Sequence, residues 1–317
     1  MKGHFSLTYY DRSTGALLTE PVYAEAFLSW SYNTTVGRFM NDLFFRQKFF
    51  SKLYGWLHKQ RWSRRKIKSF VQEMKIRVDE SLRPLEDFTD FNDFFTREID
   101  LSKRPIDDDP RVCIAPADGK VLAYPVVPVD MTFQVKRGIF NLRQFLQDDA
   151  LAKKYANGSM VVSRLSLRDY HHVHFPDSGV PQKASPMSGS YYSVAPYALH
   201  TLVPFYTENH RVLSLFDSDH FGQIAIIEVG GFTVGSVQQR YEDGVHVPKG
   251  AHKGFFELGG STVVLLFEPG AIRIDEDLLA KTEAGIETFV RLGDSIGHHP
   301  GGSIVDARSA EALWPAL

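Results

Sequence analysis

From residue 101 onward the sequence consists mainly of short apolar, β-branched runs separated by Gly, Pro and Asp. Such runs are typical of strands, which are predicted at Val112–Ile114, Val121–Val129, Met160–Leu165, Ile224–Val229 and Thr262–Phe267. Helical periodicity is confined here to Leu142–Tyr155 and Asp275–Arg291. Because strands do not alternate with long helices, a doubly wound parallel sheet is disfavoured. We expect a β-rich catalytic core over residues 101–317.

The first 100 residues predict a helical region, which makes the expected fold class α+β. No proline interrupts Asn41–Val71, and apolar residues there follow helical spacing at Phe50, Leu53, Tyr54 and Leu57. The polar face of this helix is basic. Between Arg38 and Arg77 there are twelve Lys or Arg residues against two acids, although the whole chain has a net charge of −2.

A basic amphipathic helix rich in Phe and Trp has three possible uses. It has the composition of a helix that lies in a membrane interface. It could instead pack on its own core and leave the basic face in water, or its aromatics could stack on nucleic-acid bases. No RNA-binding motif accompanies it, so a nucleic-acid partner ranks last. From composition alone, the helix packed on its own core with a solvated basic face is the favoured interpretation.

Overall composition narrows the class of protein. Apolar residues make up 43% and charged residues 23%, the balance of a globular protein with a core. No apolar run approaches the roughly 18 residues that cross a bilayer, and no signal peptide is predicted. Cys113 is the only cysteine, so it forms neither an internal disulfide nor a cysteine metal cage. We expect a soluble or membrane-surface protein of a reducing compartment.

Two segments of the core carry side chains suited to acid–base chemistry. Asp118 stands in an Asp-Gly turn after a predicted strand, and His171, His172 and His174 lie within five positions. In a strand His172 and His174 would share a face, whereas in a helix His171 and His174 would. Three histidines suggest a metal site, but neither cysteine ligands nor a His-Glu-x-x-His motif accompanies them, and none is predicted.

A candidate nucleophile comes later in the chain. Ser261 follows Gly259 and Gly260 and enters a predicted strand, without the second glycine of a nucleophile elbow. Residues 230–236 have the spacing of a phosphate loop but lack its lysine, so no nucleotide site is predicted. Asp118, a histidine and Ser261 could together form an acid, base and nucleophile, which makes a serine hydrolase one admissible interpretation.

At these residues the sequence resembles the phosphatidylserine decarboxylase family, in particular its shorter bacterial type II members. The resemblance runs from about Tyr10 to Gly297. Its motifs, in chain order, are Phe49–Gly55, Phe91–Arg97, Arg104-Pro105, Pro116–Gly119, Asp169–His174, Tyr191–Val194, Val234–Ser236 and Gly259–Thr262. Two departures are visible: His172 stands where members commonly have Arg, and His210 replaces a frequent Glu.

The resemblance implies a self-processing enzyme whose cofactor is a pyruvoyl group derived from Ser261. In the family, the serine attacks the preceding carbonyl, here that of Gly260, and elimination then divides the chain. The products would be a β chain of residues 1–260 and an α chain of residues 261–317, paired as a heterodimer. The resemblance makes His174 the base that activates Ser261 and Asp118 the carboxylate that orients it. His171 is the expected proton-transfer residue.

The implied reaction converts phosphatidylserine to phosphatidylethanolamine and carbon dioxide. Since the lipid stays in its bilayer, the resemblance favours the membrane interpretation of the basic helix, with the enzyme peripheral on the cytoplasmic face of the cell membrane. A higher oligomer is compatible with it. The alternatives are a pyruvoyl decarboxylase of a soluble amino acid, and a serine hydrolase that stays a single chain.

Overall fold

The computed structural model describes residues 8–21, 23, 34, 53, 55–129, 133–135, 138–187, 189, 209–230, 237–258 and 261–301. Its strands are β1 (Thr8–Asp11), β2 (Ala16–Thr19), β3 (Val112–Ile114), β4 (Gly119–Val127), β5 (Phe133–Val135), β6 (Gly138–Phe140), β7 (Gly158–Leu165), β8 (His172–His174), β9 (Gly179–Pro181), β10 (Ser185–Met187), β11 (Arg211–Ser218), β12 (Gln223–Gly230), β13 (Val237–Gln239), β14 (His252–Phe256), β15 (Ser261–Leu266), β16 (Arg273–Ile274), β17 (Glu287–Val290) and β18 (Ser295–His298). The α-helices are α4 (Ile67–Met74), α5 (Phe91–Phe95), α6 (Leu142–Leu146), α7 (Asp149–Lys154) and α10 (Glu276–Glu283), and the 3-10 helices are η2 (Arg61–Lys66), η3 (Val78–Glu80), η4 (Leu85–Asp87) and η5 (Leu101–Lys103).

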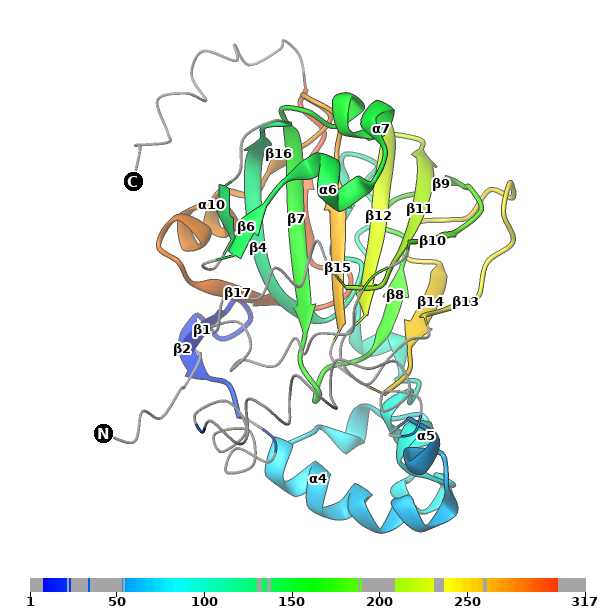
Figure 1. The fold of residues 1–317 in the computed structure, drawn as a ribbon. Helices are drawn as coiled ribbons and strands as arrows, with labels where there is room; N and C mark the ends of the chain where they lie inside the picture. Colours follow the sequence, from blue (N-terminus) through cyan, green and yellow to red (C-terminus); the bar gives the residue numbers. More distant parts are fainter. Residues whose placement is uncertain are drawn as a thin grey trace.

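One large sheet organises the β-rich core (Figure 1), in the order β10-β11-β12-β15-β7-β4-β17-β1-β2 with β9 added beside β11. Neighbouring strands are antiparallel except β1 and β17. All five predicted strands are confirmed as β3, β4, β7, β12 and β15. The antiparallel order also confirms that the fold is not doubly wound.

The large sheet is covered on both faces. On one face α6 and α7 pack Phe145 and Tyr155 against side chains such as Val264. On the other, the small sheets β13-β14-β8 and β16-β18-β3 and helix α10 pack residues such as Val173 against Val263. Side chains on both faces of β15 are therefore buried, which explains why its sequence is continuously apolar after Thr262.

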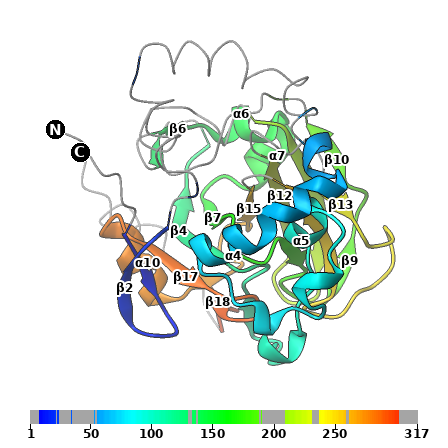
Figure 2. The ribbon, with the colours of Figure 1, turned by 90° about the horizontal axis from the view of Figure 1, so that it is seen from below.

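A helical layer formed by η2, α4 and α5 lies across one end of the large sheet, at the bottom of Figure 1 and in front in Figure 2. Its core is a cluster of T-shaped aromatic pairs, in which the Phe70 and Phe91 ring centroids are 4.9 Å apart and the Phe88 and Phe94 centroids 5.2 Å apart. Leu258, three residues before Ser261, belongs to the same cluster. The helical layer is thus packed against the segment that leads into β15.

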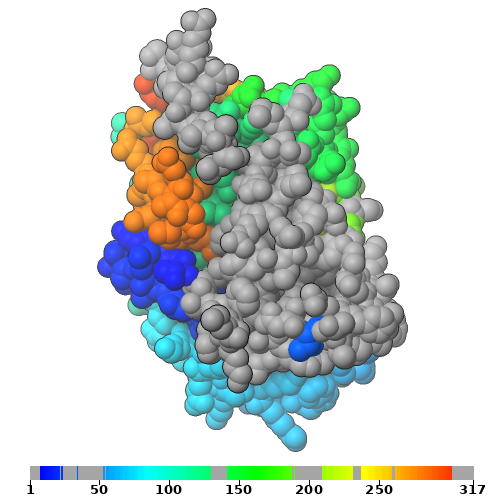
Figure 3. Space-filling view, turned by 60° about the vertical axis from the view of Figure 1, so that its left-hand side comes forward, coloured from blue at the N-terminus to red at the C-terminus, as the bar shows by residue number. Residues whose placement is uncertain are grey.

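The structure corrects three sequence-based expectations. The predicted helix at 41–71 lies outside the described residues at 41–52 and at 54, and the described part is interrupted at 59–60 before η2 and α4. The first 100 residues are not uniformly helical, because β1 and β2 join the large sheet through β17 (Figure 3, blue hairpin below the orange α10). The segment 275–291 is helical only to Glu283, since Gly285 takes a left-handed conformation (φ 71°) that ends α10 before β17.

Residues 142–155 are helical as α6 and α7, which are separated where Gln147 adopts a positive φ of 52°. Cys113 is buried and unpaired. Within the described ranges, no helix is long and apolar enough to cross a membrane.

Candidate active site

Several strands of the large sheet begin or end on the side of the sheet where the strand ends face the helical layer (Figure 1). Ser261, the first residue of β15, pairs with Gly230 at the end of β12 and with Leu165 at the end of β7. Gly119, which begins β4, pairs with Val290 at the end of β17. Asp118 and Ser261 are separated by more than 140 positions in the sequence. They nevertheless lie at the same end of two strands of one sheet, β4 and β15.

Ser261 is completely buried, and its hydroxyl has no hydrogen-bond partner among the described residues. The chain approaches it under restraint, because the Leu258 N–H donates to the Asn92 side chain on α5 (3.0 Å) and the Phe256 N–H donates to the His171 carbonyl (2.9 Å). Gly260, the expected cleavage partner, lies outside the described residues. A buried hydroxyl without a partner is unusual and marks a position where another group is expected to contact it.

The histidine stretch is a strand, and this decides between the two geometries that the sequence left open. His172–His174 form β8, which pairs with β14, so His172 and His174 share a face and Val173 points into the core. His171 therefore does not lie one helical turn from His174, as its expected role assumed. Val173 is fully buried in the core between the small sheet and the large one, as the alternation of a strand requires.

His171 is held as a neutral base. Its Nδ1 lies 2.9 Å from the Asp169 carbonyl, which can only accept, so the proton is on Nδ1 and Nε2 keeps its lone pair. Nε2 is buried with no partner in the described part of the chain, and the Phe95 ring packs 3.9 Å from the imidazole centroid. Burial lowers the pKa of His171 to about 3.

His174 shows the same arrangement with different partners. Its Nδ1–H donates to the Gly250 carbonyl (2.8 Å), and Nε2 lies 3.4 Å from the Tyr170 hydroxyl. Burial lowers the pKa of His174 to about 4. The Gly250 carbonyl, rather than a carboxylate, fixes its tautomer and leaves Nε2 able to accept a proton.

Asp118 is buried and engaged elsewhere. Its carboxylate accepts from Arg104 Nη2 (2.7 Å) and Nε (2.9 Å) and from the Leu292 N–H (2.8 Å), while Arg104 also binds Glu80 (2.8 Å). It makes no hydrogen bond to His174 in the described structure. Tyr170 relates the two groups: its hydroxyl lies 3.4 Å from His174 Nε2, and its pKa is raised by burial and then by the Asp118 charge. Sequence spacing could not show this, because Arg104 competes for the carboxylate only once the chain is folded.

Two further histidine contacts were not foreseen. His172 Nε2–H donates to the Thr96 carbonyl (3.0 Å), so its Nδ1 accepts from His252 Nε2–H (2.9 Å). The His172 ring stacks on Tyr170 with centroids 4.5 Å apart, and burial lowers its pKa to about 3. His252 lies 80 positions from His172 in a segment without a recognisable motif. Only the pairing of β8 with β14 brings the two rings together.

Asp169 anchors the turn before the histidines. Its carboxylate accepts from the Ser166 backbone N–H (2.7 Å) and from buried Lys120 (2.9 Å). The same residue's carbonyl holds His171 Nδ1–H. The sequence did not single out Lys120 and Ser166, which hold the turn before His171. Within the described ranges no three His, Cys, Asp or Glu side chains form a metal-holding group.

Comparison with known proteins identifies the family of the chain. A family model for phosphatidylserine decarboxylase matches residues 91–298. A relative from Clostridium beijerinckii, named phosphatidylserine decarboxylase proenzyme, is 41% identical over 288 residues, covering 91% of this chain and 97% of its own. Relatives of the same name from Chlamydia muridarum (41% over 289 residues, 91% and 96%) and Clostridium botulinum strain Hall (39% over 291 residues, 92% and 99%) match equally broadly.

The family match and the relatives' names therefore define an enzyme of the carboxy-lyase class. The chain belongs to the phosphatidylserine decarboxylase family. This supports the lipid decarboxylase interpretation over a decarboxylase of a soluble amino acid. It also disfavours a serine hydrolase.

The buried histidines predict how stability depends on pH. His171, His172 and His174 have folded pKa values of about 3, 3 and 4, below the ordinary value near 6.5. The unfolded chain therefore binds more protons below pH 6.5, and stability falls as pH drops from 6.5 toward 4. Each histidine contributes up to about 1.4 kcal/mol per pH unit. Urea unfolding at several pH values measures this slope.

The variant His172→Phe keeps an aromatic ring beside Tyr170 but removes one titrating group. Its slope of stability against pH should be shallower than that of the wild type, whatever its absolute stability. A wild-type stability that does not change between pH 7 and pH 5 would contradict the neutral state assigned to these rings.

Proposed function

We propose that this chain decarboxylates phosphatidylserine to phosphatidylethanolamine and carbon dioxide through a pyruvoyl group that it makes from Ser261. The observation that carries the proposal is the buried, unpartnered Ser261 hydroxyl at the start of β15, in a chain of this family. Decarboxylation of an amino acid needs an electron sink, which ordinary side chains do not provide and a pyruvoyl carbonyl does. The relatives' names contain the word proenzyme, which fits self-processing.

Self-processing would begin when the Ser261 hydroxyl attacks the Gly260 carbonyl and gives up its proton to a base. The peptide link becomes an ester, and loss of the serine α-proton then expels the Gly260 carboxylate and divides the chain. The dehydroalanine left at residue 261 takes up water and releases ammonia, which yields the pyruvoyl group. Atoms balance with water as the only co-reactant.

The two chains would remain together after cleavage. In the small chain, β15 hydrogen-bonds to β12 on one side and β7 on the other, and β17 and β18 pair with β4 and β3. Both faces of β15 are buried. Separation would break this central part of the sheet, so a heterodimer of residues 1–260 with residues 261–317 is the expected mature form.

We assign the two histidines to different steps. His174 has a lone pair on Nε2 and a proton on Nδ1 fixed by Gly250, the state needed to accept the Ser261 proton. Asp118, through its charge beside Tyr170, would favour the imidazolium that forms. His171, whose buried Nε2 has no partner in the described structure, is assigned to proton transfer at the substrate carbon.

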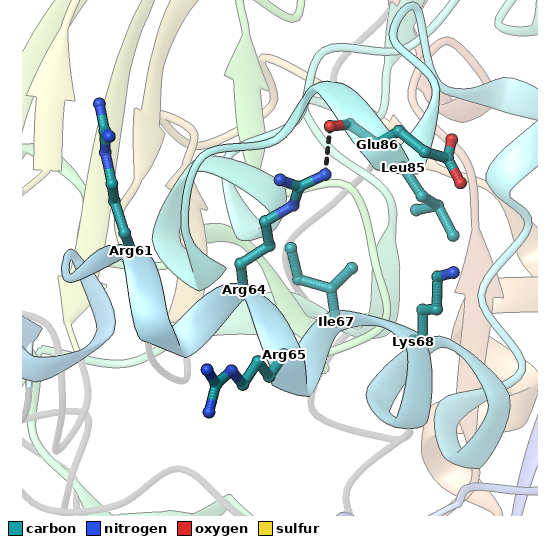
Figure 4. A pocket seen from close by; sticks show the side chains of 7 residues that line it. All are labelled: Arg61, Arg64, Arg65, Ile67, Lys68, Leu85 and Glu86. Atoms are coloured by element: carbon teal, nitrogen blue, oxygen red, sulfur yellow. Dashed lines mark hydrogen bonds between the residues drawn. The ribbon is translucent and has the colours of Figure 1, made fainter.

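The enzyme would reach its substrate as a peripheral membrane protein. Arg61, Arg65 and Lys68 line a pocket beside η2 and α4 together with Arg64, which donates to the Glu86 carbonyl (Figure 4). Among described residues, Arg61, Arg65 and Lys68 have no carboxylate within ion-pair distance. Trp56 and Trp62 nearby are 58% and 48% exposed. Unpaired cations beside exposed tryptophans suit an anionic lipid surface, and we place that surface on the cytoplasmic face.

Self-cleavage is tested by intact-mass measurement of the purified protein. We expect two chains divided between residues 260 and 261, with no free amino group at the start of the small chain. The variant Ser261→Ala should stay a single chain of about 35.9 kDa and lack activity, because it has no hydroxyl to attack. An uncut wild-type chain that decarboxylates phosphatidylserine would contradict the mechanism.

The roles of the histidines are tested by substitution. His174→Ala and Asp118→Asn should accumulate uncut chain, because the serine loses its base or the charge that supports it. His171→Ala should be cut but release carbon dioxide about 10²–10⁴-fold more slowly, the usual contribution of a proton-transfer group. A gel for cleavage and a carbon dioxide assay on each variant separate the steps.

Exposed His246 offers a matched control, and His246→Ala should behave as wild type in both assays. If His171→Ala stays uncut while His174→Ala is cut normally, the two roles are exchanged. Normal cleavage and turnover in both variants would exclude either role.

Membrane binding is tested by flotation with liposomes. Binding should increase with anionic lipid and decrease with salt, since each cation near such a surface contributes about 1 kcal/mol. The triple variant Arg61→Gln, Arg65→Gln, Lys68→Gln should bind roughly 100-fold more weakly.

A matched triple variant removes exposed lysines elsewhere, at Lys103, Lys153 and Lys183. It should float like the wild type. Equal loss in both triple variants would show that net charge, not this surface, governs binding.

A further inference from the structure

Arg97 is a buried arginine without a carboxylate partner. It is 4% exposed, and its Nη2 donates to the Arg168 carbonyl (2.9 Å), while Nη1 has no partner in the described structure. Two other buried arginines contrast with it: Arg104 bridges Glu80 and Asp118, and Arg164 bridges Glu20 and Glu287.

The carboxylates around Arg97 are already paired with other cations. Asp118 is bound by Arg104, and Asp169 by Lys120. Glu80 is shared between Arg104 (2.8 Å) and Arg77 (3.2 Å). None of the three lies within 4.0 Å of the Arg97 guanidinium. A buried cation without a counterion is unfavourable, so the free N–H group is suited to an anion that arrives from outside.

Arg97 lies against the turn that holds His171. Its hydrogen bond goes to Arg168, next to Asp169, whose carbonyl fixes the His171 proton. Phe95, two residues before Arg97, packs on the His171 ring, and the guanidinium lies 5.0 Å from the centroid of the Phe94 ring. Burial lowers the pKa of His171, and the positive charge of Arg97 lowers it further, since a nearby cation disfavours the imidazolium. Arg97 therefore lies beside the turn of the histidine to which we assign proton transfer at the substrate.

We propose that Arg97 is a specificity residue that binds the phosphodiester of the substrate, which rests on the function proposed above. The substrate carries two anionic groups. The carboxylate loses its charge as carbon dioxide leaves, so an arginine on it would stabilise the starting state and slow the reaction. The phosphodiester keeps its charge throughout. An arginine there raises affinity without opposing the chemical step, and it distinguishes the lipid headgroup from free serine.

The experiment compares Arg97→Met and Arg97→Lys with a matched control, Arg83→Met. Arg83 is in the same helical layer but half-exposed, in an ion pair with Asp93 (2.5 Å). Each purified, cleaved variant is assayed with short-chain phosphatidylserine in detergent. Arg97→Met should raise KM by roughly 30-fold or more with kcat within about threefold of wild type, the pattern of lost uniform binding. Arg97→Lys should recover part of the loss, and Arg83→Met should match wild type.

Binding is measured separately by thermal unfolding with glycerophosphoethanolamine and with ethanolamine, which lacks the phosphate. Glycerophosphoethanolamine should raise the midpoint of the wild type and of Arg97→Lys but not of Arg97→Met, and ethanolamine should act equally on all three. This readout needs no turnover, so a wild type that binds but makes no phosphatidylethanolamine would count against the proposed function alone.

Three outcomes would overturn the assignment: kcat lost at unchanged KM, unchanged kinetics in Arg97→Met, or an equal midpoint shift by glycerophosphoethanolamine in Arg97→Met and wild type. If Arg97→Met fails to fold, Arg97→Lys decides. Lysine keeps the positive charge but lacks the planar guanidinium, whose second nitrogen donates to the Arg168 carbonyl. An unchanged KM in Arg97→Lys would therefore equally reject the proposal.

Discussion

The position of β15 between β12 and β7 is the constraint on which the rest of the site depends. Its hydrogen bonds run to both neighbours, and every residue from Ser261 to Leu266 is buried. The strand begins at Ser261, so the pairing that stabilises the sheet also fixes the proposed nucleophile. A cut immediately before residue 261 would leave this pairing intact. The chain could therefore be divided at the start of a central strand without loss of its core.

Burial controls the chemistry of the histidines. His171, His172 and His174 are each neutral because desolvation disfavours the imidazolium, and each has one nitrogen held by a backbone carbonyl. Carbonyls can only accept, so they fix the tautomer without contributing charge. What distinguishes the rings is the other nitrogen: that of His172 accepts from His252, whereas that of His171 has no partner in the described structure. The different roles that we propose for these rings rest on their hydrogen-bond partners rather than on their pKa values.

The buried cations differ in whether a carboxylate of the chain neutralises their charge. Lys120 with Asp169, and Arg104 with Asp118, are paired within the chain, and they secure the turns on which the site is built. Arg97 is the contrasting case, a cation beside the same turn that is left with a free N–H group. Paired charges provide rigidity, whereas the unpaired one offers a place for an anionic ligand.

The sequence by itself determined the β-rich core, since apolar β-branched runs between turn residues have few other ways to be buried. Ordered motifs also identified the family, with Ser261, His171, His174 and Asp118 as candidates. Short-range patterns could not show that β1 and β2 join the large sheet or that Asn41–Val71 does not run on as one helix past residue 58. Only the tertiary structure decided that His172–His174 form a strand and that Arg104 binds the Asp118 carboxylate. It also decided that Arg97 has no carboxylate partner among the described residues. Each of these depends on contacts between residues far apart in the chain, which compete for partners only after the sheet has formed.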